Sequence, residues 1–384
     1  MLNQFSTLGV RSAKSSGLDE VVFAETELSH IDGDRGELWI RGYPIEELSG
    51  HVSFEAMCAL LWDGALPNAQ REQQLRLELG QARVRAYRNR ARWLEPALAL
   101  SDPMDALRAG VALLESSGDD TRDAFEIVAC VGVLLAAWSR HREGQALLEP
   151  DSQSSHASDV LRLLTGANAA ERARALETYL VTVAEHGMNA STFSARVVAS
   201  TQSDTVSAVT AALGALKGKL HGGAPGPVLD MLDAIGSEER AGAYLEAELA
   251  QGRRIMGMGH RIYRVRDPRA FVLERATQTL AAGLHTERVK LARSVERAAS
   301  ELLAERYPRR KLCANVEFFT AVLLEAVGMP RALFTATFAA ARVAGYCAHI
   351  AEQRRSGRIV RPASIFVGTR RARTAEHAGN AVPG

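Results

Sequence analysis

Two histidines stand beside glycines at points where a helix cannot continue. His221 is followed by Gly222 and Gly223, and His260 closes the run Gly257–His260. Glycine lets the backbone approach a ligand closely, and loops held by rigid helices are where catalytic groups concentrate. A single histidine in a chain is more often structural than catalytic, but two at such breaks indicate a candidate active site.

Arginines and the start of a helix follow His260. Asp267 and Pro268 form a good cap and first-position pair for that helix, and Arg269 comes directly after them. A helix N-terminus with arginines suits a carboxylate or a phosphate, although a solvated basic face has the same pattern. Arg342 lies in an alanine-rich helical segment, where a charge is costly unless it is paired. It therefore requires an anion, either a ligand or an acidic side chain.

His186 and Glu317 complete the set of candidates. The spacing of His186, Asn189, Phe193 and Arg196 predicts that these residues share one face of a helix. Glu317 falls in the first turn of another predicted helix, where a surface glutamate that complements the helix dipole is common. The pattern alone favours that surface role for Glu317.

The remaining composition excludes several classes of protein. The cysteines are few, far apart and without C-x-x-C spacing, which disfavours a zinc ribbon or a disulfide framework and fits a reducing cytoplasm: Cys58, Cys130, Cys313 and Cys347. No histidine pair has a recognised metal spacing. With 46 Lys and Arg against 45 Asp and Glu, the net charge of +1 gives no basic field for nucleic acid.

Length and hydropathy predict a two-domain protein without a membrane span. A chain of 384 residues is too long for one ordinary core. Its first 20 residues lack the apolar segment of a secretory signal. The longest apolar run, Ile127–Trp138, is too short to cross a bilayer and is typical of a buried helix.

The elements that must position the candidate residues are mostly helices. Near the N-terminus, Val21–Phe23 and Leu38–Ile40 flank turn-forming Asp-Gly and Arg-Gly pairs, which predicts a small β-hairpin. After Pro44 the pattern is helical. Residues 139–158 are polar and predict a connecting loop.

Helix boundaries near the candidate site have local signals. One apolar stripe has a 3.6-residue period, and its members are Val206, Val209, Leu213, Leu216 and Leu220. Pro227 is expected to begin the next helix. Asn315 is the expected cap of a later helix that ends at Gly328.

Taken in order, the motifs resemble those of citrate synthase and its relative 2-methylcitrate synthase, from about Gly17 to Gly368. The segments that carry the resemblance are Ile31-Asp32-Gly33, Arg41-Gly42-Tyr43, Asp102-Pro103-Met104-Asp105, His186 with Asn189-Ala190-Ser191-Thr192, Leu220-His221-Gly222-Gly223, Gly257-Met258-Gly259-His260-Arg261, Asp267-Pro268-Arg269, Asn315-Val316-Glu317-Phe318 and Arg361-Pro362.

The resemblance implies a nearly all-α fold in two domains, a large one of residues 1–218 and 325–384 and a small one of residues 219–324. It places the active site in the cleft between them, which closes on substrate. It also implies a cytoplasmic homodimer with a role in the tricarboxylic acid cycle, in which Arg361 enters the site of the neighbouring subunit.

The resemblance implies a reaction between an acyl-CoA and an oxo acid such as oxaloacetate. His221 would stabilise the enolate of the thioester, Glu317 would take the α-proton, and His260 would polarise the ketone. The groups that hold the carboxylates would be His186, Arg269, Arg342 and, from the other subunit, Arg361. The groups near CoA would be Met256, Gly257, Met258, Gly259 and Arg264. No metal and no tightly bound cofactor is implied.

One residue departs from the family pattern. The family's base is usually aspartate, and Glu317 adds a methylene to it. A displacement of about 1 Å costs roughly 100-fold in rate. Three functions therefore stand side by side: citrate synthesis from acetyl-CoA, 2-methylcitrate synthesis from propionyl-CoA, and a weakly active paralogue that binds CoA or dicarboxylates in a regulatory role.

Overall fold

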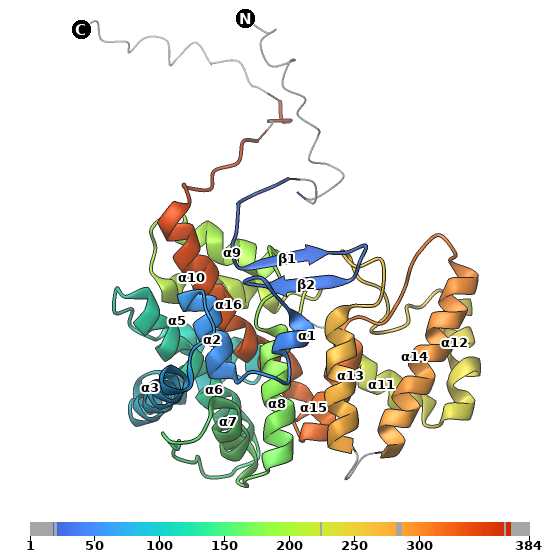
Figure 1. Cartoon of the computed structure of the whole chain (residues 1–384), viewed down its shortest axis with the longest axis horizontal. Helices are drawn as coiled ribbons and strands as arrows, with labels where there is room; N and C mark the ends of the chain where they lie inside the picture. The colour runs from blue at the N-terminus through green and yellow to red at the C-terminus, as the bar shows by residue number, and fades with distance from the viewer. Residues whose placement is uncertain (1–17, 19–20, 223–224, 282–285, 365, 370–384) are drawn as a thin grey trace, which may run out of the picture.

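The computed structural model describes residues 18, 21–222, 225–281, 286–364 and 366–369. It is built from helices with one small sheet, as predicted (Figure 1). The sheet has three antiparallel strands in the order β1 (Ser29–Asp32), β2 (Glu37–Ile40) and β3 (Tyr43–Pro44).

The predicted hairpin is confirmed, but its first strand is Ser29–Asp32 and not Val21–Phe23. The carboxylate of Asp32 accepts the backbone N–H groups of Asp34 and Arg35, which closes the hairpin immediately after Asp32. This short turn sets the register of the strands. It places Asp32 opposite Glu37, so the residues that pair with β2 are those that come just before Asp32.

Eleven of the helices that the structure describes form a layered bundle. They are α1 (Ile45–Leu48), α2 (Phe54–Asp63), α3 (Ala69–Arg88), α4 (Arg90–Leu98), α5 (Pro103–Ala112), α6 (Asp120–Arg142), α7 (His156–Thr165), α8 (Ala170–Val183), α9 (Ala190–Ala199), α10 (Thr205–Leu216) and α16 (Phe334–Ser356). Figure 1 shows the bundle beside a second group of helices, and α8 lies on the side of the bundle that faces this group.

The second group comes from the segment between α10 and α16. Its members are α11 (Pro225–Ile235), η1 (Glu238–Arg240), α12 (Ala241–Ala250), α13 (Pro268–Ala281), α14 (Thr286–Arg306), α15 (Val316–Val327) and η2 (Arg331–Leu333). Within it α12 packs on α14, while α13 and α15 also pack against α8 of the bundle. The predicted domain limits at residues 218 and 325 stay a prediction.

Two helices form the centre of the bundle. Among the described residues, α6 alone is long and apolar enough to cross a membrane, but 78% of its apolar window is buried inside the protein, as expected of a core helix. The alanine-rich α16 packs within the chain against α2, α6, α8, α9 and α10. At Gly345 an added Cβ would lie 2.3 Å from the carbonyl oxygen of Ala184, so glycine permits this close approach.

Several predicted boundaries move by a few residues. Helix α10 ends at Leu216, and Leu220 is fully exposed beyond it. Helix α11 begins at Pro225 and not at Pro227. The connecting loop covers residues 143–155 and not 139–158, because α6 continues to Arg142 with basic residues in its last turn.

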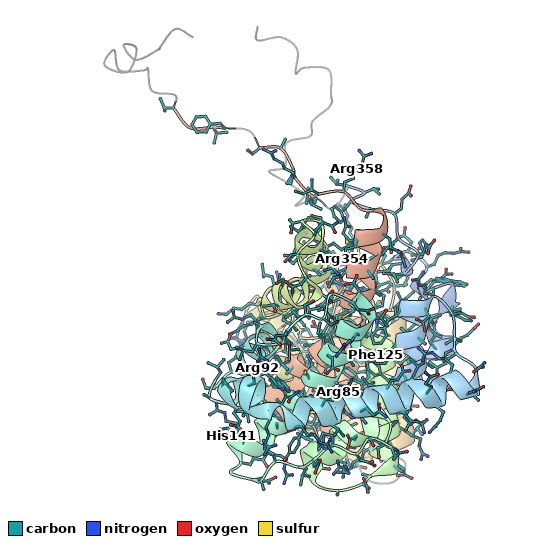
Figure 2. All side chains as sticks on the ribbon, turned by 90° about the vertical axis from the view of Figure 1, so that its left-hand side faces the viewer. Arg85, Arg92, Phe125, His141, Arg354 and Arg358 are labelled. Carbon is teal, nitrogen blue, oxygen red and sulfur yellow. The ribbon has the colours of Figure 1, made fainter. Side chains whose placement is uncertain are left out.

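The chain leaves the bundle a few residues after α16, since the backbone N–H of Val360 still donates to the hydroxyl of Ser200 at 3.0 Å. Figure 2 shows Arg354 at this end of the bundle and Arg358 farther out, where the tail leaves it. Of the described tail residues 357–364, those from 361 onward are exposed. The tail therefore extends away from the body of its own chain.

Candidate active site

The loop before His260 and the start of α15 are joined by backbone contacts. An isolated antiparallel bridge pairs Met258 with Ala314. The backbone N–H of Asn315 donates to the carbonyl of Gly257 at 2.9 Å, and its side chain donates to the carbonyl of Gly259 at 2.9 Å. The two glycines have φ values of 73° and 86°, a conformation that favours glycine. The histidine loop and the first turn of α15 therefore form one unit.

The hydrogen bonds around His260 define which nitrogen carries its proton. Nδ1 accepts the backbone N–H groups of Ile262 at 3.1 Å and Tyr263 at 3.2 Å. Burial, and then the charge of Arg269, lowers the pKa of His260 to about 4. At neutral pH the ring is uncharged, and because Nδ1 is an acceptor its proton is on Nε2, ready to be donated.

His186 lies in the link between α8 and α9, so the predicted helical face is wrong. The chain turns at Gly187, where φ is 60°, and Asn189 then caps α9 with its side chain. The His186 ring is buried and lies 5.6 Å from that of His260, centre to centre. Burial, and then Arg269 and Arg342, keeps the pKa of His186 well below its usual range.

Arg269 is buried and paired with Asp267. Its Nε and Nη2 atoms donate to the two carboxylate oxygens at 3.0 and 2.7 Å. The same carboxylate accepts the backbone N–H of Val316 at 3.2 Å, so Asp267 joins the starts of α13 and α15. A bidentate pair of this kind fixes the plane of the guanidinium.

Arg342 is buried and forms no ion pair with the residues that the structure describes. Its Nε donates to the carbonyl of Val183 at 2.6 Å, and its Cζ atom lies 4.6 Å from the ring centre of Phe338. Its Nη2 is buried and has no hydrogen-bond partner among the described residues. An unpaired buried donor is costly. The acidic partner that was one of the two alternatives for Arg342 is not found among the described residues.

His221 follows the end of α10 and contacts Ser191. Its Nε2 lies 2.7 Å from the Ser191 hydroxyl and accepts the Ser191 backbone N–H at 3.3 Å. Burial, and then Arg342, lowers the pKa of His221 to about 4. The neutral ring therefore carries its proton on Nδ1. The hydroxyl of Thr335 donates to the carbonyl of Gly222 at 2.8 Å and holds the turn against α16.

Glu317 is half-buried in the first turn of α15, and the predicted surface role is wrong. Its backbone N–H donates to the side chain of Asn315, but its carboxylate faces the charged groups of the site. Burial raises the pKa of Glu317 to about 7, although Arg269 lowers it and Asp267 raises it further. A carboxylate with this pKa is suited to act as a general base near neutral pH.

The three histidines and Glu317 converge on the two buried arginines. The charge of Arg269 acts on the pKa of His186, His260 and Glu317, and that of Arg342 acts on His186 and His221. The pKa of His186 in turn responds to both His221 and His260. Imidazoles, a carboxylate and guanidinium groups from distant parts of the sequence thus share one region.

The other predicted site residues are the loop before His260 and two exposed arginines. Arg361 is exposed on the tail that follows α16. Arg264 is exposed, and its backbone N–H donates to the carbonyl of Gly33 at 2.7 Å. The loop residues proposed for CoA lie beside His260, and two of them are half-buried against the core: Met256 and Met258. No group of three or more His, Cys, Asp or Glu among the described residues has the arrangement of a metal site.

Three further residues, to which no sequence pattern gave a role, contact the site: Ser191, Tyr263 and Tyr346. Tyr263 and Tyr346 are fully buried and contact the site histidines directly or through Ser191. In the sequence, Ser191 is marked only by its place in the motif that begins at Asn189. No local signal marks the two tyrosines, because their partners are far away in the sequence.

Comparisons with known proteins show the family of the chain. The family model described as "Citrate synthase, C-terminal domain" matches residues 17–363. The citrate synthase of Synechocystis is 37% identical, over 92% of this chain and 90% of its own length. A 2-methylcitrate synthase of Mycobacterium tuberculosis is 36% identical, over 94% of this chain and 92% of its own length.

Solved structures give the same result. A citrate synthase of Thermotoga maritima is 33% identical, with a TM-score of 0.81 over 93% of this chain and 97% of that chain. A citrate synthase of Thermoplasma acidophilum, solved as a ternary complex with carboxymethyl coenzyme A and oxaloacetate, is 27% identical, with a TM-score of 0.84 over 95% of this chain and 98% of that chain.

Proposed function

This chain belongs to the citrate synthase family, and we propose that its site condenses acetyl-CoA with oxaloacetate to give citrate and CoA. The observation that carries the proposal is the meeting of two neutral imidazoles and a carboxyl group of raised pKa beside two buried guanidinium groups.

The acyl half of the reaction begins with proton removal. The carboxylate of Glu317 takes a proton from the methyl group of the acetyl thioester. Because this proton is weakly acidic, the negative charge that develops on the thioester oxygen needs a positioned donor. The Nδ1–H of His221 supplies it, since its Nε2 is occupied by Ser191.

The oxo-acid half of the reaction forms the new bond. The enolate carbon attacks the ketone carbon of oxaloacetate, and the ketone oxygen becomes the hydroxyl oxygen of the product. His260 donates its Nε2 proton to that oxygen, because its Nδ1 is held as an acceptor by two backbone N–H groups. Hydrolysis of the thioester then releases citrate and CoA.

The charges of oxaloacetate are matched by several cations. Arg269 and Arg342 each present a guanidinium to one carboxylate, and neutral His186 adds a hydrogen bond. We propose that the chain is a cytoplasmic homodimer and that Arg361, exposed on its tail, completes the oxo-acid site of the neighbouring subunit.

CoA is proposed to bind as a substrate, with no tightly bound cofactor. The loop of residues 256–259 lies beside His260, and the exposed Arg264 is available for a CoA phosphate. The cleft between residues 219–324 and the rest of the chain is the proposed point of entry, and its closure keeps bulk water from the thioester until the new carbon–carbon bond has formed.

A second candidate substrate is propionyl-CoA. The relative named 2-methylcitrate synthase is nearly as similar as those named citrate synthase. One methylene in an acyl pocket is worth only about 1–3 kcal/mol, so both thioesters are expected to react at different rates. A third candidate, a regulatory paralogue with little activity, is motivated by Glu317 in place of the family's usual aspartate.

One assay separates the three candidates. The protein is mixed with oxaloacetate and either acetyl-CoA or propionyl-CoA, and release of free thiol is followed. We expect faster release from acetyl-CoA. Faster release from propionyl-CoA would favour the second candidate, and no release from either thioester despite measurable CoA binding would favour the third.

A further inference from the structure

Two buried tyrosines contact two of the site's histidines, one directly and one through Ser191. The hydroxyl of Tyr263 lies 3.2 Å from Nε2 of His186. The hydroxyl of Tyr346 donates at 2.6 Å to Ser191, whose own hydroxyl lies 2.7 Å from Nε2 of His221. Tyr263 is 1% exposed and Tyr346 is fully buried. Each tyrosine therefore reaches a different histidine of the same site.

The proton of the Tyr263 hydroxyl has one acceptor. Burial raises the pKa of this phenol, so it stays protonated, and His186 is neutral. Within the described part of the chain, Nε2 of His186 is the one hydrogen-bond partner of the hydroxyl. If Nε2 carried the imidazole proton, the phenol would be left without an acceptor, which is costly in a buried site. The phenol therefore donates, and His186 presents Nδ1–H.

The Tyr346 contact directs the proton of Ser191. Burial raises the pKa of Tyr346 to about 12, so its hydroxyl also stays protonated and acts as the donor to Ser191. The serine hydroxyl proton is then left for Asn189 at 2.7 Å or for Nε2 of His221. Since the Ser191 backbone N–H also points at Nε2, this nitrogen of His221 is held as an acceptor.

We propose that Tyr263 and Tyr346 are positioning residues that divide the site between them. Tyr263 orients His186 and through it the oxo acid, whereas Tyr346 acts through Ser191 to orient His221 and through it the thioester enolate. This division rests on the proposed function for the identity of the two substrates.

Tyrosine-to-phenylalanine variants test the division, because they remove one hydroxyl and keep the ring. Tyr263→Phe is expected to raise the KM for oxaloacetate about 3- to 10-fold and to leave kcat within about 2-fold, as loss of one neutral hydrogen bond predicts. Tyr346→Phe is expected to lower kcat about 3- to 10-fold and to leave the KM for oxaloacetate unchanged. With methyl-deuterated acetyl-CoA, only Tyr346→Phe should increase the isotope effect on kcat.

The matched control is Tyr87→Phe. Tyr87 lies in α3, where its half-buried ring packs under Arg90, and it has no contact with the site. This variant should keep all kinetic constants. Thermal unfolding of the three variants checks that each one folds like the unmodified protein.

A second measurement tests the proposal and does not depend on catalytic turnover. In ¹⁵N spectra of the imidazoles, Tyr263→Phe should shift the signals of His186 and leave those of His221, and Tyr346→Phe should do the reverse. Absence of thiol release from the unmodified protein would reject the proposed function alone. Kinetic or spectral changes that are the same in both variants, or absent in both, would overturn the division of labour.

Discussion

The two halves of the site are built in different ways. On the proposed oxo-acid side Arg269 and Arg342 are at most 2% exposed and come from the start of α13 and the middle of α16. On the proposed acyl side His221 and Glu317 are half-buried. His221 lies on a turn that follows a helix, next to Gly222.

The difference matches what each half must bind. Oxaloacetate is small and doubly charged, and buried guanidinium groups attract it strongly because the local dielectric constant is low. Acyl-CoA is much larger and has to enter from solvent, so its half of the site stays accessible. Burial is still sufficient there to raise the pKa of Glu317. Under the proposed function, charge is thus concentrated on one side of the site and proton transfer on the other.

The largest expected effect comes from a substitution that disables the acyl half of the site alone. Glu317→Gln removes the proposed base, and kcat should fall by about 10²- to 10⁴-fold, the usual contribution of a general base. Oxaloacetate binding, measured by calorimetry, should change little because Arg269, Arg342 and His186 remain. Turnover that persists in this variant would assign the base to another group. Glu317→Asp, which restores the usual residue of the family, is the control and should retain activity.

His260→Ala tests the link between the halves. Removal of the proton donor to the ketone should lower kcat by about 10²- to 10³-fold, as for other donors to a developing negative charge. Thiol release measures the loss. His260→Gln, which keeps an N–H donor, should lose less, and an unchanged kcat in His260→Ala would remove this residue from the mechanism.

Arg361→Ala tests whether the oxo-acid half is complete in one chain. We expect the KM for oxaloacetate to rise about 10-fold, because the variant lacks the guanidinium that would form a charge-assisted hydrogen bond with a substrate carboxylate. Subunits with Arg361→Ala are then mixed with subunits with His221→Ala. Mixed dimers contain one intact site and should regain activity. If mixing restores nothing, the sharing of sites between subunits is wrong.

Glu317 is also expected to make stability and activity depend on pH. The pKa of Glu317 is about 7 in the folded protein against 4.5 for an ordinary glutamate. The folded state holds this proton more tightly than the unfolded state, so this residue's contribution to stability is lost as pH rises from about 4.5 to about 7. The activity of the unmodified protein should rise over pH 6–8, as the base loses its proton.

Glu317→Gln should therefore increase the free energy of unfolding above pH 7 by up to about 3 kcal/mol, since each pKa unit corresponds to roughly 1.4 kcal/mol. Near pH 4 the variant and the unmodified protein should be equally stable. Denaturant unfolding at the two pH values measures the difference. If the variant is less stable than the unmodified protein at pH 8, burial does not destabilise the charged form of Glu317.

The helical fold could be predicted from the sequence, and the motifs that resemble the family marked most of the candidate site residues. Asn315 and Gly328 mark the ends of α15 as predicted, because capping and left-handed termination act within one turn. The glycines beside His221 and His260 also identified the two turns correctly. These signals are local and require no knowledge of the rest of the chain.

The charge states and hydrogen-bond partners of those residues depend on the folded structure and could not be predicted from local patterns. Burial among distant segments sets the pKa of Glu317, and the sequence pattern gave it a surface role instead. Tyr346 meets Ser191 across 155 positions, and Arg342 is left with a buried unpaired nitrogen by the packing of α16. Desolvation and long-range hydrogen bonds depend on what surrounds a group in space, which spacing along the chain does not specify.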